Sequence, residues 1–221
     1  MNFEEIYLDI DTQGDLMLPD GGLYVQGAAA ILPRIRGLIQ HAHDEQALVI
    51  STMQTYPADA QEFDHLPKHC VEGSTGWGKV PVTLVKPYYD VVAEGDEQPD
   101  WPTIAKEHAQ IIVRKRELPP FETTLLGEIF EALAPERVTI FGVTSDFGVI
   151  PSAEYLIAKG HRVRVVFDAM RGVSDDNAAK DQTRLQQDGA ELVTTADIIG
   201  SNVRRRPTSR SLASRRKAVS P

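Results

Sequence analysis

Two residues of opposite charge follow apolar, strand-like segments and could work together as an acid and a base. Asp11 comes directly after the apolar run at residues 6–10, and Lys115 comes directly after residues 109–114. A carboxylate beside an ammonium group at one edge of a sheet forms an acid/base pair in which each charge stabilises the other. Charges at strand ends are common, so the residues alone leave an ordinary salt bridge, or two solvated charges, as alternatives.

A second candidate for chemistry is the turn at residues 141–151, which reads Phe-Gly-Val-Thr-Ser-Asp-Phe-Gly-Val-Ile-Pro. An apolar strand ends there and a helical segment follows, which is where an open α/β sheet usually carries its chemistry. The backbone amides of Thr144, Ser145, Phe147 and Gly148 could form a hydrogen-bonding cradle at the start of that helix. The hydroxyls of Thr144 and Ser145 could attack a substrate only if a base lay close by.

Apolar runs and helical periodicity predict the elements that must position these residues. Strands are expected at residues 6–10, 47–53, 109–114, 137–141, 162–167 and 191–194, and helices at 26–43, 122–133, from the turn to about 159, and around 175–188. This alternation predicts a single-domain, three-layer α/β/α fold with a mainly parallel, Rossmann-like sheet of about six strands. Five polar or turn residues fall at or just past predicted strand ends, the edge where active sites form in such sheets: Asp11, Gln54, Lys115, Gly148 and Asp168.

Two segments are expected to lie outside the regular elements. Residues 54–80 form a long loop rich in Pro and Gly, and a loop of that length in a compact domain is usually functional. Residues 90–102 are acidic and contain proline, which predicts a surface insertion.

Composition favours a cytoplasmic, globular protein. The chain has 221 residues and a single cysteine, Cys70, so it has no intramolecular disulfide. No apolar run approaches the length of a membrane span, and the first residues lack the basic and apolar segments of a signal peptide.

The basic residues are concentrated at the C-terminus. Residues 204–221 hold seven Arg or Lys and no acid, so the remainder carries 16 basic and 32 acidic residues and a net charge of −16. An acidic body repels nucleic acid at long range. We therefore expect one folded domain over residues 1–200 and a disordered basic tail over 201–221, which is a solvated extension or, as the alternative, a contact for nucleic acid or acidic lipid.

Five motifs in order resemble those of the isochorismatase-like hydrolases, the superfamily that includes nicotinamidases. They are the segments 10–16 (family Val-Asp-x-Gln-x-Asp-Phe), 69–76 (His-Cys-x-x-Gly-Thr-x-Gly), 113–115 with its downstream residues (the lysine segment), 142–149 (Gly-Val-x-Thr-Asp-Tyr-Cys-Val) and 167–174 (Asp-Ala-x-x-Gly-x-Ser). The resemblance extends over roughly residues 5–195. It implies that Asp11 and Lys115 share one pocket as the catalytic pair, that a non-proline cis peptide lies near Val143–Thr144, and that the protein is a homo-oligomer.

The sequence also departs from the family at two places. Gly148 stands where the family has its nucleophilic cysteine, and glycine cannot attack a carbonyl. Nicotinamidases bind metal through an Asp-x-His segment after the second strand, and this chain has Gln54-Thr55-Tyr56 there, so only His69 remains. One imidazole does not make a tight site for a divalent metal. We therefore expect no catalytic metal and no other cofactor.

The true isochorismatases, which hydrolyse a vinyl ether, also resemble this pattern, because they combine Asp, Lys, a glycine at the cysteine position and a glutamine after the second strand, whereas residues 69–76 resemble the nicotinamidases instead. By that resemblance Asp11 protonates the vinyl carbon, Lys115 orients it or binds a substrate carboxylate, and Gln54 positions substrate or water. Their lysine segment reads Lys-x-Arg-Tyr-Ser-Ala-Phe, whereas residues 115–121 read Lys-Arg-Glu-Leu-Pro-Pro-Phe. The group that would grip a dicarboxylate is therefore not apparent, although Arg116 or Lys79 could serve.

These observations leave three functional hypotheses. The first is a hydrolase that acts on a small polar molecule without a cysteine nucleophile; the second is a catalytically inactive, isochorismatase-like protein that binds a ligand or a protein partner. The third is a nicotinamidase-like amidohydrolase rescued by another group such as Cys70. The residues expected to contact the small molecule are Gln54, Tyr56, His69, Trp77, Thr144, Phe147 and Gly148. For the aromatic residues among these, plain packing is the alternative, and for His69 a hydrogen-bonded place in the loop.

Overall fold

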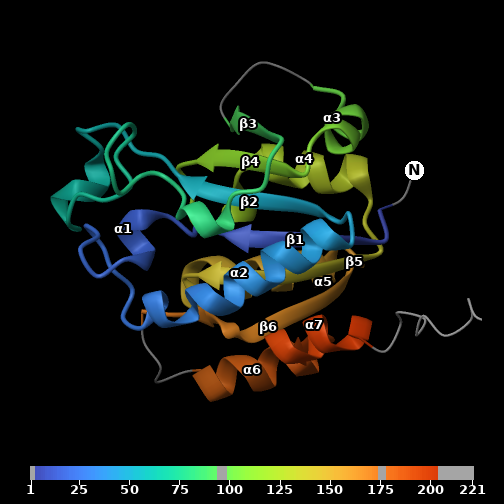
Figure 1. The fold of residues 1–221 in the computed structure, drawn as a ribbon. Coiled ribbons are helices and arrows are strands. Elements are labelled where there is room, and N and C mark those ends of the chain that lie inside the picture. Colours follow the sequence, from blue (N-terminus) through green and yellow to red (C-terminus); the bar gives the residue numbers. More distant parts are fainter. Residues whose placement is uncertain (1–2, 94–98, 174–177, 204–221) are drawn as a thin grey trace, which may run out of the picture.

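A computed structural model describes residues 3–93, 99–173 and 178–203. Seven strands form one parallel sheet in the order β3-β4-β2-β1-β5-β6-β7. The strands are β1 (Glu5–Ile10), β2 (Leu48–Gln54), β3 (Tyr88–Val92), β4 (Gln110–Lys115), β5 (Arg137–Val143), β6 (Arg162–Arg171) and β7 (Glu191–Val193). The predicted three-layer α/β/α class is confirmed (Figure 1).

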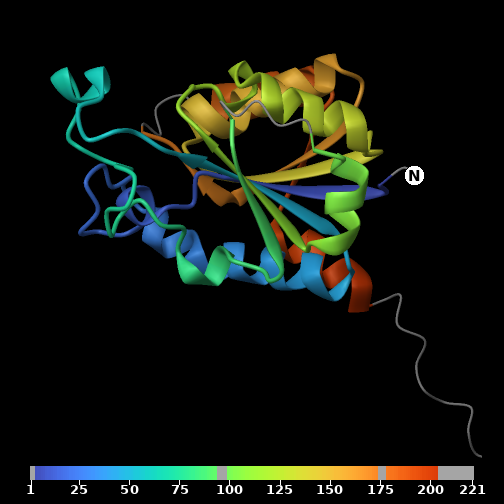
Figure 2. The same ribbon diagram turned by 90° about the horizontal axis from the view of Figure 1, so that it is seen from above.

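Helices cover both faces of the sheet. They are α1 (Gly14–Met17), α2 (Ala28–Asp44), α3 (Trp101–Glu107), α4 (Thr124–Leu133), α5 (Ile150–Ala158), α6 (Ala178–Gln187) and α7 (Thr195–Val203). Figure 2 shows α2 and α7 on one side of the sheet and α4 on the other. We call these sides the α2 face and the α4 face. Each face buries its own apolar cluster, with Val49 of β2 in the α2-face cluster and Ile50 in the α4-face cluster. In the described part of the chain, no helix is both long enough and apolar enough to span a membrane.

The structure corrects the prediction for residues 90–102. The edge strand β3 begins at Tyr88, and α3 begins at Trp101 after Asp100, whose side chain accepts a hydrogen bond from the Thr103 amide. The sequence pattern did not predict these elements for two reasons. Strand β3 is only half-buried on alternate residues, and α3 is a short helix with proline in its first turn. The sheet therefore has seven strands where about six were expected.

The C-terminal part of the fold also differs from expectation. Strand β6 continues to Arg171, so Asp168 lies within the strand and not past its end. Its carboxylate accepts hydrogen bonds from the amide and hydroxyl of Thr195 and pairs with Arg34, so it holds the start of α7. Helix α7 was not predicted and runs to Val203, so the expected domain boundary at residue 200 falls inside it. Of the predicted basic tail at 201–221, residues 201–203 belong to α7, and the rest lies outside the described residues.

Candidate active site

The structure brings Asp11 and Lys115 together. Lys115 Nζ lies 3.1 Å from Asp11 Oδ2, and both side chains are buried, at 0% and 1% exposure. The pairing follows from the sheet order, because Gln54 at the end of β2 is in register with Lys115 at the end of β4, and β1 lies on the other side of β2. A buried ion pair of this kind is costly to assemble, so it needs further hydrogen bonds to hold it.

The backbone at Asp11 turns its carboxylate toward Lys115. Strict alternation along β1 would place Asp11 on the same face as Asp9. Asp9 instead contacts Ser51, while Asp11 contacts Thr52, the next residue of β2, whose side chain points to the opposite face. Asp11 has a φ of +46°, in the left-handed region that non-glycine residues adopt infrequently. This change of conformation at the strand end directs the carboxylate to the α4 face.

Two residues of β2 complete the surroundings of the carboxylate. Thr52 Oγ1 donates to Asp11 Oδ1 at 2.5 Å, and Gln54 Nε2 donates to Asp11 Oδ2 at 3.2 Å. Gln54 Oε1 is buried and has no hydrogen-bond partner among the described residues. Since the amide nitrogen is engaged by Asp11, this oxygen is an acceptor available to a substrate hydroxyl or a water. The sequence reasoning missed Thr52, although its place two residues before Gln54 in a buried strand put both on one face.

Gln13 fixes the backbone of Gln54. Gln13 Oε1 accepts from the Gln54 amide at 2.7 Å, while Gln13 Nε2 donates to the carbonyls of Gln54 at 2.8 Å and Trp77 at 2.7 Å. One buried side chain therefore joins the end of β2, the segment after β1 and the long loop. This residue was also missed as a contributor, although it lies in the segment at residues 10–16.

The loop after β4 holds Lys115 from the other side. Lys115 Nζ donates to the carbonyl of Glu117 at 3.1 Å. The Glu117 carboxylate in turn accepts from the Thr123 hydroxyl at 2.6 Å and from the Arg116 amide at 3.2 Å. Partial burial would raise the pKa of Glu117, but these hydrogen bonds and the charge of Lys115 outweigh it and lower that pKa below its ordinary value. Glu117 is therefore a charged brace for the loop that supports the lysine.

The turn after β5 has the expected cis peptide, between Val143 and Thr144. A π-helical turn, η4 (Ser145–Val149), follows it. The Phe147 amide donates to Thr144 Oγ1 at 3.3 Å, and the Gly148 amide donates to the Thr144 carbonyl at 2.9 Å. Two of the four amides expected to form an open cradle are thus occupied within the turn, because the side chain and the carbonyl of the N-cap residue Thr144 accept their hydrogen bonds. Phe147 is 54% exposed and contributes a side chain at the surface of the turn.

Gly148 packs against Ile10 of β1. A Cβ atom at position 148 would lie 2.6 Å from Ile10 Cγ2, closer than carbon atoms approach without a shift. Ile10 is completely buried, and its Cγ2 branches next to the backbone of the central strand. The turn and the strand therefore fit each other only when residue 148 lacks a side chain.

Tyr56, His69 and Trp77 are tied to the loops around the site. Tyr56 Oη donates to the Arg116 carbonyl at 3.2 Å, and burial raises the pKa of this hydroxyl. His69 Nδ1 bonds the Pro67 carbonyl at 2.8 Å, and its ring meets that of Tyr56 edge-on at 5.3 Å. Trp77 Nε1 donates to Thr55 Oγ1 at 3.0 Å. His69 thus has the hydrogen-bonded loop place that was one of its two alternatives.

This donor set does not fit a divalent metal. Tyr56 uses its hydroxyl on a backbone carbonyl, and Gln54 offers only a neutral amide oxygen, so one imidazole nitrogen of His69 is left. Within the described ranges, no group of three or more His, Cys, Asp or Glu residues is arranged to hold a metal ion. A catalytic metal typically requires three or more protein ligands.

Cys70 and Lys79 are not available to a substrate. Cys70 is completely buried, and burial raises the pKa of its thiol well above the usual range, so it remains protonated. Lys79 lies 2.7 Å from Asp9 Oδ2, and its side chain is 1% exposed. Its suggested role as a grip for a substrate carboxylate is wrong, because it is already paired in the interior. Arg116 is exposed and, with Arg114 and Lys115, lines a pocket of about 110 Å³.

Taken together, the parallel sheet and the buried carboxylate–ammonium pair at the carboxyl ends of its strands define an α/β protein with its candidate site at that edge. A family model for the isochorismatase domain matches residues 86–197. The chain belongs to the isochorismatase family. No curated protein matches the chain.

Solved structures share the fold. The pyrazinamidase of Pyrococcus horikoshii in complex with zinc is 24% identical, with 86% of this chain and 99% of that chain covered and a TM-score of 0.67. A pyrazinamidase/nicotinamidase from Streptococcus mutans is 21% identical, with 86% and 99% covered and a TM-score of 0.70. An isochorismatase family protein from Desulfovibrio vulgaris is 19% identical, with 93% and 100% covered and a TM-score of 0.73.

Proposed function

We propose that this protein is an isochorismatase-family hydrolase that acts on a small polar molecule through Asp11 and Lys115, without a cysteine nucleophile, and that hydrolysis of a vinyl ether is its reaction. One observation carries the proposal: Asp11 Oδ2 is shared by Lys115 and Gln54, while Gln54 Oε1 is buried and unpartnered among the described residues. The site thus combines a proton donor and acceptor pair with a free acceptor for water. It offers no side chain at Gly148 for covalent attack.

The reaction uses these groups in sequence. Asp11 delivers a proton to the terminal vinyl carbon, which leaves an oxocarbenium ion at the carbon that bears the ether oxygen. That proton comes from Lys115, whose Nζ lies 3.1 Å from Asp11 Oδ2, so its transfer to the substrate leaves the pair with one negative charge beside the oxocarbenium ion. Water held by Gln54 Oε1 adds to the oxocarbenium carbon, and its released proton returns to Lys115 through Asp11. The resulting hemiketal collapses to a ketone and an alcohol.

A mechanism in which another side chain of the turn or loop acts as the nucleophile has little support. Cys70 is buried with its pKa raised, and Thr144 Oγ1 accepts a hydrogen bond from the Phe147 amide. The names pyrazinamidase and nicotinamidase belong to structural neighbours that are less than 25% identical. An amidohydrolase therefore stays the weaker alternative.

A catalytically inactive binding protein is the second candidate. The observation that favours it is the contact between Ile10 and Gly148, because the Ile10 methyl group occupies the space into which a side chain at position 148 would extend. A pocket remodelled in this way could bind a small molecule without converting it. We also propose that the protein is a cytoplasmic homo-oligomer with a small-molecule ligand.

The test is the turnover of isochorismate, followed by loss of its vinyl-ether signals in NMR, with the Asp11→Asn variant measured beside the native protein. Removal of a general acid typically costs about 10²- to 10⁴-fold in rate. Turnover that falls by this amount in a folded variant supports the proposal. Absence of turnover by folded native protein rejects isochorismate as substrate and favours the binding protein.

A further inference from the structure

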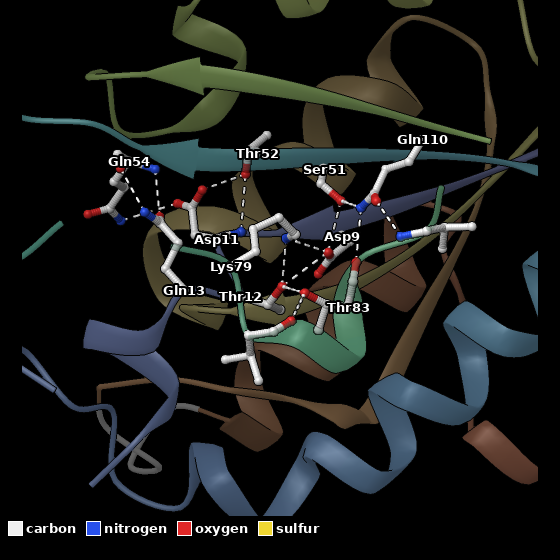
Figure 3. A network of polar contacts seen from close by, with 12 residues as sticks. Asp9, Asp11, Thr12, Gln13, Ser51, Thr52, Gln54, Lys79, Thr83 and Gln110 are labelled. Atoms are coloured by element: carbon white, nitrogen blue, oxygen red, sulfur yellow. Dashed lines mark hydrogen bonds and ion pairs between the residues drawn. The ribbon is translucent and has the colours of Figure 1, made fainter. Parts of the chain in front are cut away.

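Asp9 and Lys79 form a second buried ion pair, separate from the pair of Asp11 and Lys115. Lys79 Nζ is 2.7 Å from Asp9 Oδ2, with the two side chains 1% and 0% exposed. Asp9 lies in β1 and Asp11 directly follows that strand, yet Asp9 points to the α2 face while Asp11 points to the α4 face. Figure 3 shows the two carboxylates with their separate sets of partners. The proposed reaction uses neither Asp9 nor Lys79.

The hydroxyl groups around this pair contact only one of the two carboxylate oxygens of Asp9. Asp9 Oδ2 accepts from Ser51 Oγ at 2.9 Å and from Thr12 Oγ1 at 3.1 Å, and Lys79 Nζ also donates to Thr12 Oγ1 at 2.7 Å. Asp9 Oδ1 is buried without a hydrogen-bond partner among the described residues. Among these contacts of Asp9, Lys79 is the only cation. The position of the carboxylate therefore depends on the lysine.

The network extends to the segment after Lys79. Thr12 Oγ1 lies 3.1 Å from Thr83 Oγ1. Gln110 Nε2 donates to Ser51 Oγ at 2.7 Å and to the Thr83 carbonyl at 3.0 Å (Figure 3). Residues from β1, β2 and β4 are thus joined to the short helix η2 (Pro81–Thr83) that follows Lys79.

The backbone around the pair lies against the residues that follow Asp11. The Val80 amide donates to the Thr12 carbonyl at 2.9 Å, the Gly14 amide to the Gly78 carbonyl at 2.9 Å, and the Asp15 amide to the Gly76 carbonyl at 2.7 Å. Gln13 and Lys79 face each other as an antiparallel bridge. The segment 76–80 is therefore held beside residues 12–15, directly after Asp11.

We propose that Asp9 and Lys79 are positioning residues, whose ion pair holds the segment 76–80 against residues 12–15 and thereby fixes the backbone of Asp11 and the side chain of Gln13. A left-handed conformation at a non-glycine residue persists only where its surroundings hold it, and Asp11 has φ of +46°. Gln13 carries the effect to the second site residue through its hydrogen bonds to the backbone of Gln54. The catalytic part of this inference rests on the proposed function.

The test uses a variant that removes both charges. Lys79→Met alone leaves a buried carboxylate without its cation and is expected to be poorly folded. Asp9→Asn/Lys79→Met replaces the pair by neutral groups of similar size and is expected to fold. The control is Glu154→Gln/Arg184→Gln, which removes an exposed ion pair between α5 and α6. All proteins are compared by thermal unfolding, by hydrogen exchange of the Gly14, Asp15 and Val80 amides, and by isochorismate turnover.

The Asp9→Asn/Lys79→Met variant is expected to stay folded and to exchange these three amides faster than the native protein. Its kcat is expected to fall about 10- to 100-fold with little change in KM, because small displacements of reacting groups slow the chemical step. The control is expected to match the native protein in hydrogen exchange and in kcat. Native exchange and native kcat in the folded double variant would overturn the inference. If the native protein does not turn over isochorismate, the exchange measurement decides alone: faster exchange supports positioning although the proposed substrate fails, and unchanged exchange overturns it.

Discussion

At the scale of single residues, the site depends on the glycine at position 148, which has no side chain. A cysteine at position 148 would place Cβ 2.6 Å from Ile10 Cγ2 in the buried centre of the sheet. Overpacking of this kind typically costs about 1–3 kcal/mol, because strand and turn must move apart. The close fit of Gly148 and Ile10 thus couples the chemistry available at the turn to the packing of the central strand.

Gly148→Cys is therefore expected to lower the free energy of unfolding by about 1–3 kcal/mol and to give no hydrolysis of nicotinamide or pyrazinamide. The matched variant Ile10→Leu/Gly148→Cys removes the β-branch and should recover part of that loss. Denaturant unfolding and ammonia release are measured on both. Amidase activity in either folded variant would contradict the proposal and favour an amidohydrolase pocket.

At the scale of elements, the sequence predicted the strands that form continuous apolar runs, and with them the edge that carries Asp11, Gln54 and Lys115. Buried parallel strands have this pattern because both faces are covered. The edge strand β3 lacks it, since its residues alternate between exposed and half-buried. Alternation along β1 could not have placed Asp11, because the face it reaches depends on a backbone conformation that no residue pattern specifies. Sequence periodicity also could not predict contacts between segments that are far apart in the chain, such as the ion pair of Lys79 with Asp9.

The loop after β4 gives an element-scale prediction about pH. The pKa of Glu117 is lowered in the folded protein, so its carboxylate contributes stability that is present above its unfolded pKa and lost as the pH falls through the folded value. Glu117→Gln should therefore be less stable than the native protein at neutral pH, and the difference should shrink under acid conditions. Thermal unfolding from pH 7 down to pH 3 measures this. Exposed Glu122→Gln is the control, and a difference that grows toward low pH would contradict the assignment.

At the scale of the whole molecule, charge is divided between the domain and its C-terminal extension. Residues 1–203 carry 16 basic and 32 acidic residues, whereas residues 204–221 carry seven basic residues and no acid. The described residues end with α7, whose start Asp168 holds through Thr195. The stability of the fold and the attraction to anions should therefore belong to different parts of the chain.

A chain truncated after Val203 is expected to unfold at the same temperature as the full chain, since the contacts of the sheet and of α7 are retained. The full chain should bind a single-stranded DNA oligonucleotide weakly at low salt and release it as salt rises, because opposite charges more than about 10 Å apart are screened at 0.1 M. The truncated chain, with its net charge of −16, should show no binding. Fluorescence anisotropy across a salt series measures both proteins. Equal binding by the two chains would place the anion contact on the domain and not on the basic extension, and a lower unfolding temperature after truncation would show that the extension supports the fold.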